Sequence, residues 1–304
     1  ILQQGSKLIN MLNMGLDVQH AAQILYVFRY AVCRLSSNKD IISQCISDSQ
    51  CIPMLLDDFH GHGIPTYYCR RVDVARIRLM DIFISHELIT AQAPKNTFLH
   101  YCTRCLKQYH KNHKTCVDIL RIILRCLHRA HSRGDLNKSD ARDLVWFVTQ
   151  QTTQSNFPDL RIALSVLQCI FCECDQRCFR CACCHGTESD QSLCSDALEF
   201  CMRCVKRIFP SNVECRLQTE SLTMCMTIMF AILEYEQHSV PRLLNQNTIF
   251  FSKMQEQLTA TISLVRRLRA LHGRAEYKVG PIANFMHHSA VLLQWHEENV
   301  GYSC

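Results

Sequence analysis

Apolar residues recur at intervals of three and four positions along most of this chain, and this spacing constrains its fold more than any other feature. In the stretch 17–35, the N-cap candidate Asp17 is followed by a regular series of apolar residues: Ala21, Ile24, Leu25, Phe28, Val32 and Leu35. Side chains at these intervals share one face of an α-helix. The same spacing predicts further helices over residues 72–89, 117–127, 140–151, 159–172, 195–209, 219–235, 248–272 and 281–298.

Residues that form tight turns are scarce, with only 9 Gly and 7 Pro among 304 residues. An all-β fold needs many such turns, and they consume Gly and Pro. No stretch alternates apolar and polar residues as a half-buried strand does. We therefore expect an all-α chain of about a dozen helices joined mostly by short loops.

Helices of this length, paired by short polar turns, resemble the armadillo and HEAT families of helical repeats. The resemblance implies a right-handed solenoid over residues 1–304, and a globular helical domain is the alternative. Within this single region, the polar stretch Ser132–Asn137 suggests a sub-boundary near 132–138, and Cys172–Gln191 is the longest candidate loop. The chain begins with Ile1, so we expect it to be a segment of a larger protein.

Cysteine is unusually frequent, with 21 residues. The number is odd, and many cysteines, such as Cys33, Cys126, Cys169 and Cys225, lie within apolar helical runs. A reduced cysteine packs as a small hydrophobic residue. We therefore expect a reducing compartment, the nucleus or the cytoplasm. Charged residues break every apolar run well short of about 20 residues, so no membrane partner is expected.

The densest cysteine cluster is a candidate zinc site. Cys178 and Cys181 are paired at the spacing of zinc ligands, and Cys201 and Cys204 repeat it. The last two also continue the apolar face of a predicted helix, so core thiols beside a cysteine-rich loop are the competing interpretation. A second, weaker set of zinc-type residues has the same competing interpretation: Cys102, Cys105, His110, His113 and Cys116.

Basic residues form two candidate partner-binding faces. Arg121, Arg125 and Arg129 recur every four residues and share one helical face, which Arg133 follows. Three lysines precede this row, at positions 107, 111 and 114. The second face holds Arg266, Arg267 and Arg269. Such arginines contact phosphates or acidic peptides, or they form the solvated side of an amphipathic helix.

Known catalytic signatures are absent from the sequence. It has no glycine-rich phosphate loop and no His-Glu-x-x-His helix. Only the segment 57–63, with two aspartates and two histidines, suggests acid–base chemistry, and a turn between helices is the favoured interpretation of this segment. We therefore expect no enzyme activity, no resident cofactor unless zinc is bound, and no small-molecule substrate.

These features favour a non-enzymatic scaffold that binds a protein partner, because solenoids present long surfaces for peptides and helices. A nucleic-acid or chromosome-associated adaptor that uses the basic faces is the alternative, and a zinc-stabilised interaction module is the second alternative. Cysteine- and leucine-rich helical repeats are also similar to the solenoid parts of nuclear checkpoint, repair and meiotic adaptors, among them the ATR-interacting checkpoint adaptors. That similarity implies a role in the response to DNA damage, and it assigns no role to any single residue.

Overall fold

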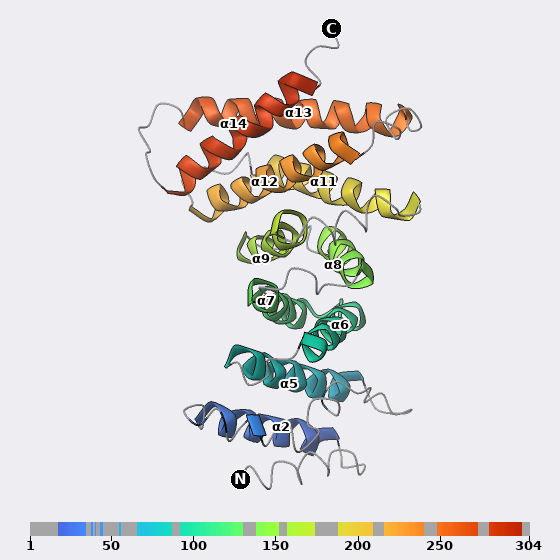
Figure 1. The fold of residues 1–304 in the computed structure, drawn as a ribbon, viewed down its shortest axis with the longest axis vertical. Helices are drawn as coiled ribbons and strands as arrows, with labels where there is room; N and C mark the ends of the chain where they lie inside the picture. Colours follow the sequence, from blue (N-terminus) through green and yellow to red (C-terminus); the bar gives the residue numbers. More distant parts are fainter. Residues whose placement is uncertain are drawn as a thin grey trace. The chain divides into compact units, whose positions relative to one another are not determined.

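The structure of the chain is a computed structural model. It describes residues 18–34, 38, 40, 43–44, 55, 66–86, 92–129, 138–151, 157–173, 188–208, 216–239, 248–272 and 280–299. Within these ranges lie ten α-helices and one π-helical turn, and no strand (Figure 1). The predicted all-α class is therefore confirmed. None of the described helices combines the length and the hydropathy that crossing a membrane requires.

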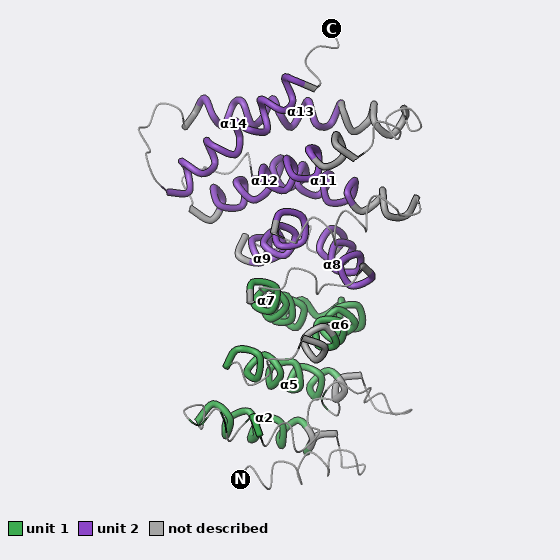
Figure 2. The backbone as a smooth tube through the Cα atoms, viewed as in Figure 1, with its two compact units in different colours: residues 1–136 green, residues 137–304 purple. Residues whose placement is uncertain are grey.

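The chain divides into two compact units, residues 1–136 and residues 137–304 (Figure 2). In the sequence, the division falls within the polar stretch Ser132–Asn137.

Unit 1 is built around a central helix, α5. Its four helices are α2 (Val18–Arg34), α5 (Thr66–Ser85), α6 (Gln92–Gln108) and α7 (His113–Arg129). Helix α5 lies between α2 on one side and the α6–α7 pair on the other. It carries apolar residues on most of its circumference, and six of them are no more than 1% exposed: Val72, Ala75, Ile77, Leu79, Met80 and Phe83. Phe83 meets Phe28 of α2 edge to face, with ring centroids 6.2 Å apart.

A carboxylate is buried in the middle of unit 1. Asp73 of α5 is 2% exposed and accepts hydrogen bonds from two tyrosine hydroxyls. Tyr101 of α6 donates to Oδ1 at 2.5 Å, and Tyr109, in the turn after α6, donates to Oδ2. Both carboxylate oxygens are satisfied, which offsets much of the cost of burying the charge. One side chain thus joins α5 to α6 and to the turn that follows it.

Unit 2 is a second helical stack centred on α12. Its elements are α8 (Lys138–Gln151), α9 (Phe157–Gln168), the π-helical turn η1 (Cys169–Glu173), α11 (Glu188–Ile208), α12 (Arg216–Ser239), α13 (Thr248–His272) and α14 (Pro281–Asn299). Helix α12 contacts α9, α11 and α14. Five of its apolar side chains are fully buried: Leu222, Cys225, Met226, Ile228 and Met229.

Several helices begin earlier than the apolar spacing predicts. Helix α5 begins at Thr66 rather than at residue 72, and α7 begins at His113 rather than at residue 117. The predicted loop Cys172–Gln191 includes helical residues at both ends, because Cys172 belongs to η1 and α11 already begins at Glu188. The first turns of α7 and α11 are mostly polar, and in α5 the two arginines at positions 70 and 71 interrupt the apolar spacing, so periodicity does not detect these turns.

The Asp73 cluster predicts a clear order of stability among variants. Tyr101→Phe removes one donor to a buried carboxylate and should lower the free energy of unfolding by about 1–3 kcal/mol. Asp73→Ala leaves two buried hydroxyls without their acceptor and should cost more. Urea-induced unfolding of the whole chain, followed by circular dichroism, measures both. The exposed Tyr26→Phe is the matched control and should stay within about 0.5 kcal/mol of the parent. A Tyr101→Phe variant as stable as this control would refute the structural role of Asp73.

Buried thiols and the buried phenol predict a loss of stability in alkali. Burial raises the pKa of Cys116 to about 11, and burial together with the Asp73 charge raises the pKa of Tyr101. Below the ordinary thiol pKa of 9.0, folded and unfolded chains hold the same proton on Cys116. Above it, the unfolded chain loses that proton first, so the free energy of unfolding should fall as pH rises from 9 towards 11. Urea midpoints measured across this range test the sign, and a midpoint that rises would contradict it.

Candidate functional site

The predicted arginine row lies along one face of α7. Arg121 and Arg125 are both half-exposed, with 51% of each side chain accessible. The side chains of Arg129 and Arg133 lie outside the part of the structure that is described. Lys114 and Asp118 fall on the same face, because they stand seven and three residues before Arg121.

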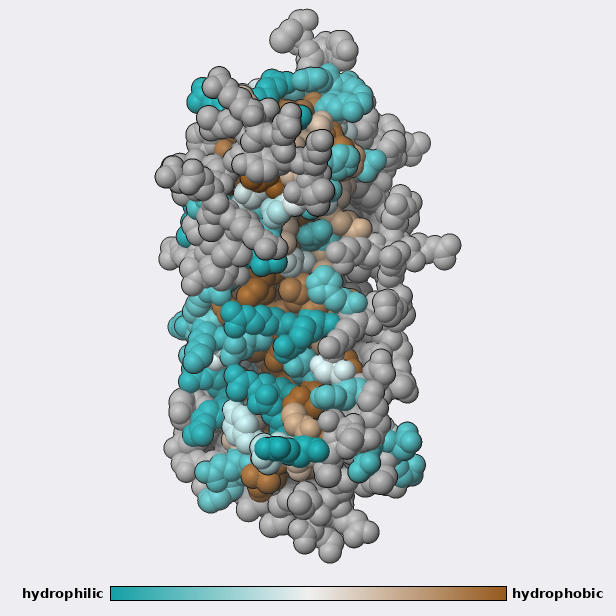
Figure 3. All heavy atoms as spheres, turned by 90° about the vertical axis from the view of Figure 1, so that its left-hand side faces the viewer, coloured by the Kyte–Doolittle hydropathy of each residue, from teal (hydrophilic) through white to brown (hydrophobic). Residues whose placement is uncertain are grey.

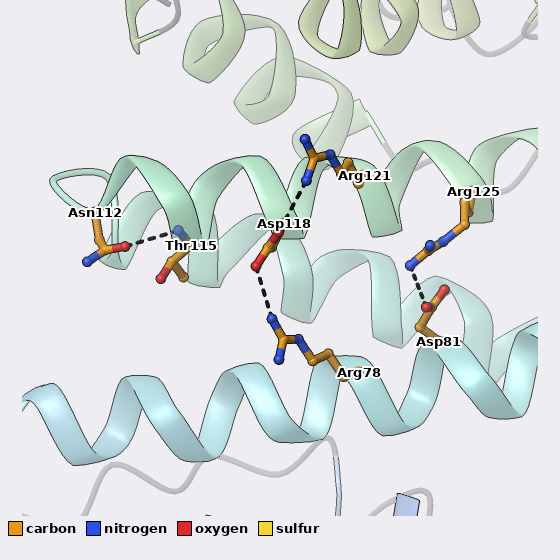
Figure 4. A network of polar contacts seen from close by, with 7 residues as sticks. All are labelled: Arg78, Asp81, Asn112, Thr115, Asp118, Arg121 and Arg125. Atoms are coloured by element: carbon orange, nitrogen blue, oxygen red, sulfur yellow. Dashed lines mark hydrogen bonds and ion pairs between the residues drawn. The ribbon is translucent and has the colours of Figure 1, made fainter. Parts of the chain in front are cut away.

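Ion pairs tie this row to the central helix α5 (Figure 4). Arg125 Nη2 lies 2.5 Å from Oδ2 of Asp81 on α5. Asp118 lies between two arginines: its Oδ2 is 3.0 Å from Arg78 Nη2 of α5, and its Oδ1 is 3.5 Å from Arg121 Nη1. Two ion pairs, Arg125–Asp81 and Arg78–Asp118, therefore join α5 to α7, whereas Arg121 pairs only within α7. Three guanidinium groups meet two carboxylates here, which leaves a small surplus of positive charge.

The larger surplus lies at the turn between α6 and α7. Residues 88–117 contain no Asp or Glu. Five exposed basic side chains cluster there, and we call them the basic turn: Lys107, His110, Lys111, His113 and Lys114. Lys111 and Lys114 form no ion pair within the described residues. Their ammonium groups are therefore available to an anionic partner.

The turn holds its shape through its own hydrogen bonds. Asn112 caps α7, because its Oδ1 accepts a hydrogen bond from the backbone N of Thr115 at 3.0 Å. The backbone N of Asn112 donates to the Tyr109 carbonyl at 2.8 Å, and the Cys116 thiol donates to the same carbonyl at 3.3 Å. The Tyr109 hydroxyl in turn reaches Asp73. The lysines thus stand on a backbone that is anchored to the core of unit 1.

Two features add positive potential at the basic turn. The first turn of α7 carries no acidic residue, although the helix macrodipole would favour one there. The residues of unit 1 include 17 Lys and Arg against 10 Asp and Glu, a formal charge of +7. The residues of unit 2 include 16 against 17, a formal charge of −1. Figure 3 shows hydrophilic side chains gathered on the face of unit 1 at the level of α5 and α7.

The second predicted face, on α13, is less concentrated. Arg266 Nη2 lies 3.0 Å from Glu297 Oε1 of α14, and both side chains are at least half exposed. Arg267 is exposed, whereas Arg269 is only partly so. Since unit 2 has no net positive charge, this group offers little attraction beyond its immediate neighbours.

The cysteines of the candidate zinc site are divided between described and undescribed parts of the chain. Cys178 and Cys181 lie outside the described residues. Cys201 and Cys204 are 0% and 5% exposed on α11, and both thiols exchange hydrogen bonds with Cys225 of α12. The hydrogen bond with Cys225, followed by burial, raises the pKa of Cys204. Among the described residues, no group of three or more His, Cys, Asp or Glu side chains is placed to hold a metal ion.

The weaker zinc set does not converge on one point. Cys102, Cys105 and Cys116 are buried, whereas His110 and His113 are exposed in the basic turn. Burial, followed by the charge of Asp73, raises the pKa of Cys105 and keeps the thiol neutral. The acid–base candidate at residues 57–63 lies outside the described residues.

Exposure within the fold separates two classes of thiol. Cys33 and Cys172 are exposed, whereas Cys201, Cys204 and Cys225 are buried. We expect alkylation of the native chain, resolved by peptide mass spectrometry, to modify the first two rapidly and the other three only when the chain opens. Labelling in urea is the control, because all five should then react alike. Equal native labelling of Cys204 and Cys172 would contradict the packing of α11 on α12.

The run without carboxylates at 88–117 was visible in the sequence, and charge counting by segment would have placed the candidate site at the turn rather than on the arginine row. The exposure of Lys111 and Lys114 could be established only from the fold. The chain matches no protein-family model, no curated protein and no solved structure.

Proposed function

We propose that this chain is a non-enzymatic interaction scaffold, and that the basic turn of unit 1 receives an acidic segment of a protein partner. The observation that supports this most directly is the pair Lys111 and Lys114, exposed and without an ion pair among the described residues, within 30 residues that lack any carboxylate. A lysine ammonium is a compact charge on a flexible stem, so it adapts to carboxylates at varied positions.

The helical organisation supports the scaffold role. Each unit is a stack of helices: in unit 1, α5 packs against α2, α6 and α7, and in unit 2, α12 packs against α9, α11 and α14. This arrangement is compatible with an armadillo- or HEAT-like solenoid, in which the fold presents binding residues and does no chemistry. The abundance of cysteine in apolar helical runs suits a protein of the nucleus or the cytoplasm.

Nucleic acid is the second candidate partner, and the spacing of charges on α7 favours it. Lys114, Arg121 and Arg125 share one face and extend over roughly 16 Å at the helical rise of 1.5 Å per residue. This length is comparable to that of several successive phosphates along a nucleic-acid strand. A checkpoint, repair or meiotic role would follow from this alternative.

Reversing the charge of the basic turn tests both candidates. We expect the double variant Lys111→Glu and Lys114→Glu to weaken binding of a labelled acidic peptide by about tenfold or more, measured by fluorescence anisotropy on the whole chain. The double variant Lys206→Glu and Arg207→Glu is the matched control, because it reverses two exposed charges in the last turn of α11 in unit 2. Equal affinity of the parent and the 111/114 variant would refute the proposal.

Salt separates the two partner classes. A DNA duplex bound through several phosphates should lose affinity steeply between about 50 and 200 mM salt, and removal of two contacts should lower the slope by about two. A short acidic peptide releases fewer counterions and should show a shallower slope. Tight, steeply salt-dependent DNA binding that the 111/114 variant abolishes, with no peptide binding, would replace the protein partner by nucleic acid.

A further inference from the structure

Exposed apolar side chains are concentrated on one helix. Four large apolar side chains are exposed among the described residues, and three of them lie on α2: Tyr26, Val27 and Tyr30, at 36%, 63% and 61%. The fourth, Trp146, lies on α8 of unit 2. Single exposed apolar residues are ordinary, but a group on one helix indicates a contact surface.

The three residues form a continuous patch, which we call the α2 stripe. Tyr30 follows Tyr26 by four positions and Val27 by three, so all three share one face of the helix. The opposite face, with Leu25, Phe28 and Val32, is buried and packs against α5. The stripe therefore lies outside the core that the described helices of unit 1 form, and the packing of α2 on α5 does not account for its apolar character.

A cation is fixed at the end of the stripe. Arg34 Nε donates a hydrogen bond to the Tyr30 hydroxyl at 3.0 Å, and the guanidinium carbon lies 5.2 Å from the centroid of the same ring. The two contacts restrict both side chains and lower the entropy that binding would otherwise cost. Tyrosine and arginine are also the residues that dominate the binding energy of many interfaces.

The charge around the stripe selects the sign of the partner. Helix α2 contains Arg29 and Arg34 and no Asp or Glu. Unit 1 as a whole carries the surplus of +7. A partner that covers Val27 and Tyr30 with apolar side chains would therefore gain from carboxylates beside Arg34, whereas a basic partner would be repelled.

We propose that the α2 stripe docks an amphipathic helix of a protein partner, with large apolar residues on one face and Asp or Glu along its flank. Helical partners of this kind use anchors at positions i, i+3 or i+4, and i+7, which match the spacing of Tyr26, Val27 and Tyr30. The surface is separate from the basic turn, because α5 lies between α2 and the α6–α7 pair.

Two designed helical peptides with the same leucine pattern test this proposal. One carries Glu at its flanking positions, and the other carries Lys. We expect the whole chain to bind the Glu peptide and to bind the Lys peptide at least about tenfold more weakly. Val27→Asp and Tyr30→Ala should each weaken the Glu peptide about tenfold or more, and Arg34→Gln should reduce the preference for Glu over Lys.

Trp146→Ala is the matched control, because it removes an exposed aromatic side chain from unit 2 and should leave peptide affinity unchanged. Circular dichroism shows whether each variant folds, and amide hydrogen exchange should show protection of α2 when the Glu peptide is bound.

Failure of the Glu peptide to bind, or equal binding of both peptides, overturns the proposal. Sedimentation that shows a dimer of the parent, lost in Val27→Asp, would also overturn it, because a second copy would then be the occupant. The 111/114 variant should bind the Glu peptide as the parent does, which keeps this outcome distinct from that of the basic turn.

Discussion

The bond between Asp73 and Tyr109 links the core of unit 1 to its most charged surface. A buried carboxylate is costly unless donors satisfy it, and the two tyrosine hydroxyls do so. Tyr109 is also the residue whose carbonyl accepts from Asn112 and Cys116. The same residue therefore anchors the turn to α5 and shapes the backbone that carries Lys111 and Lys114. Without this anchor, repulsion between the ammonium groups of Lys111 and Lys114 would favour a more open turn.

Ion pairing divides the basic residues of unit 1 into two groups with different roles. Arg78 meets Asp118 and Arg125 meets Asp81 across the α5–α7 contact, whereas Arg121 pairs with Asp118 within α7. Each pair is partly exposed and contributes on the order of 0–1 kcal/mol, so the main effect of the two inter-helix pairs is to favour one register of α5 and α7. The arginine fork suits this fixed geometry, whereas Lys111 and Lys114 each carry a compact ammonium charge on a flexible stem. The role of a row of cations on a helix thus depends on which side chains of the neighbouring helix face it. A count of charges along the sequence does not show which of these cations are paired.

Local patterns in the sequence predicted most of the helices. The features that these patterns did not predict are mainly contacts between side chains of different helices. The stretch 248–272 coincides with α13, and 17–35 differs from α2 by one residue at each end. Apolar spacing alone predicts both helices. Helix α6 was not among the predicted helices, because its first turns are polar. The pairing of Arg125 with Asp81 joins residues 44 apart, and the hydrogen bonds of Cys201 and Cys204 with Cys225 join two helices. No local pattern encodes such distances.

The α2 stripe shows the same limit from the apolar side. Along α2, apolar residues occur on both faces, so periodicity alone does not distinguish the face that packs from the face that remains open. The contact with α5 makes that distinction, since Leu25, Phe28 and Val32 are covered and Val27 and Tyr30 are not. The α2 stripe and the basic turn then lie on opposite sides of α5. The α2 stripe offers apolar contact area, and the basic turn offers positive charge. Because apolar contact persists in salt while charge attraction is screened, a partner held by both surfaces would be recruited by the lysines and retained by the stripe.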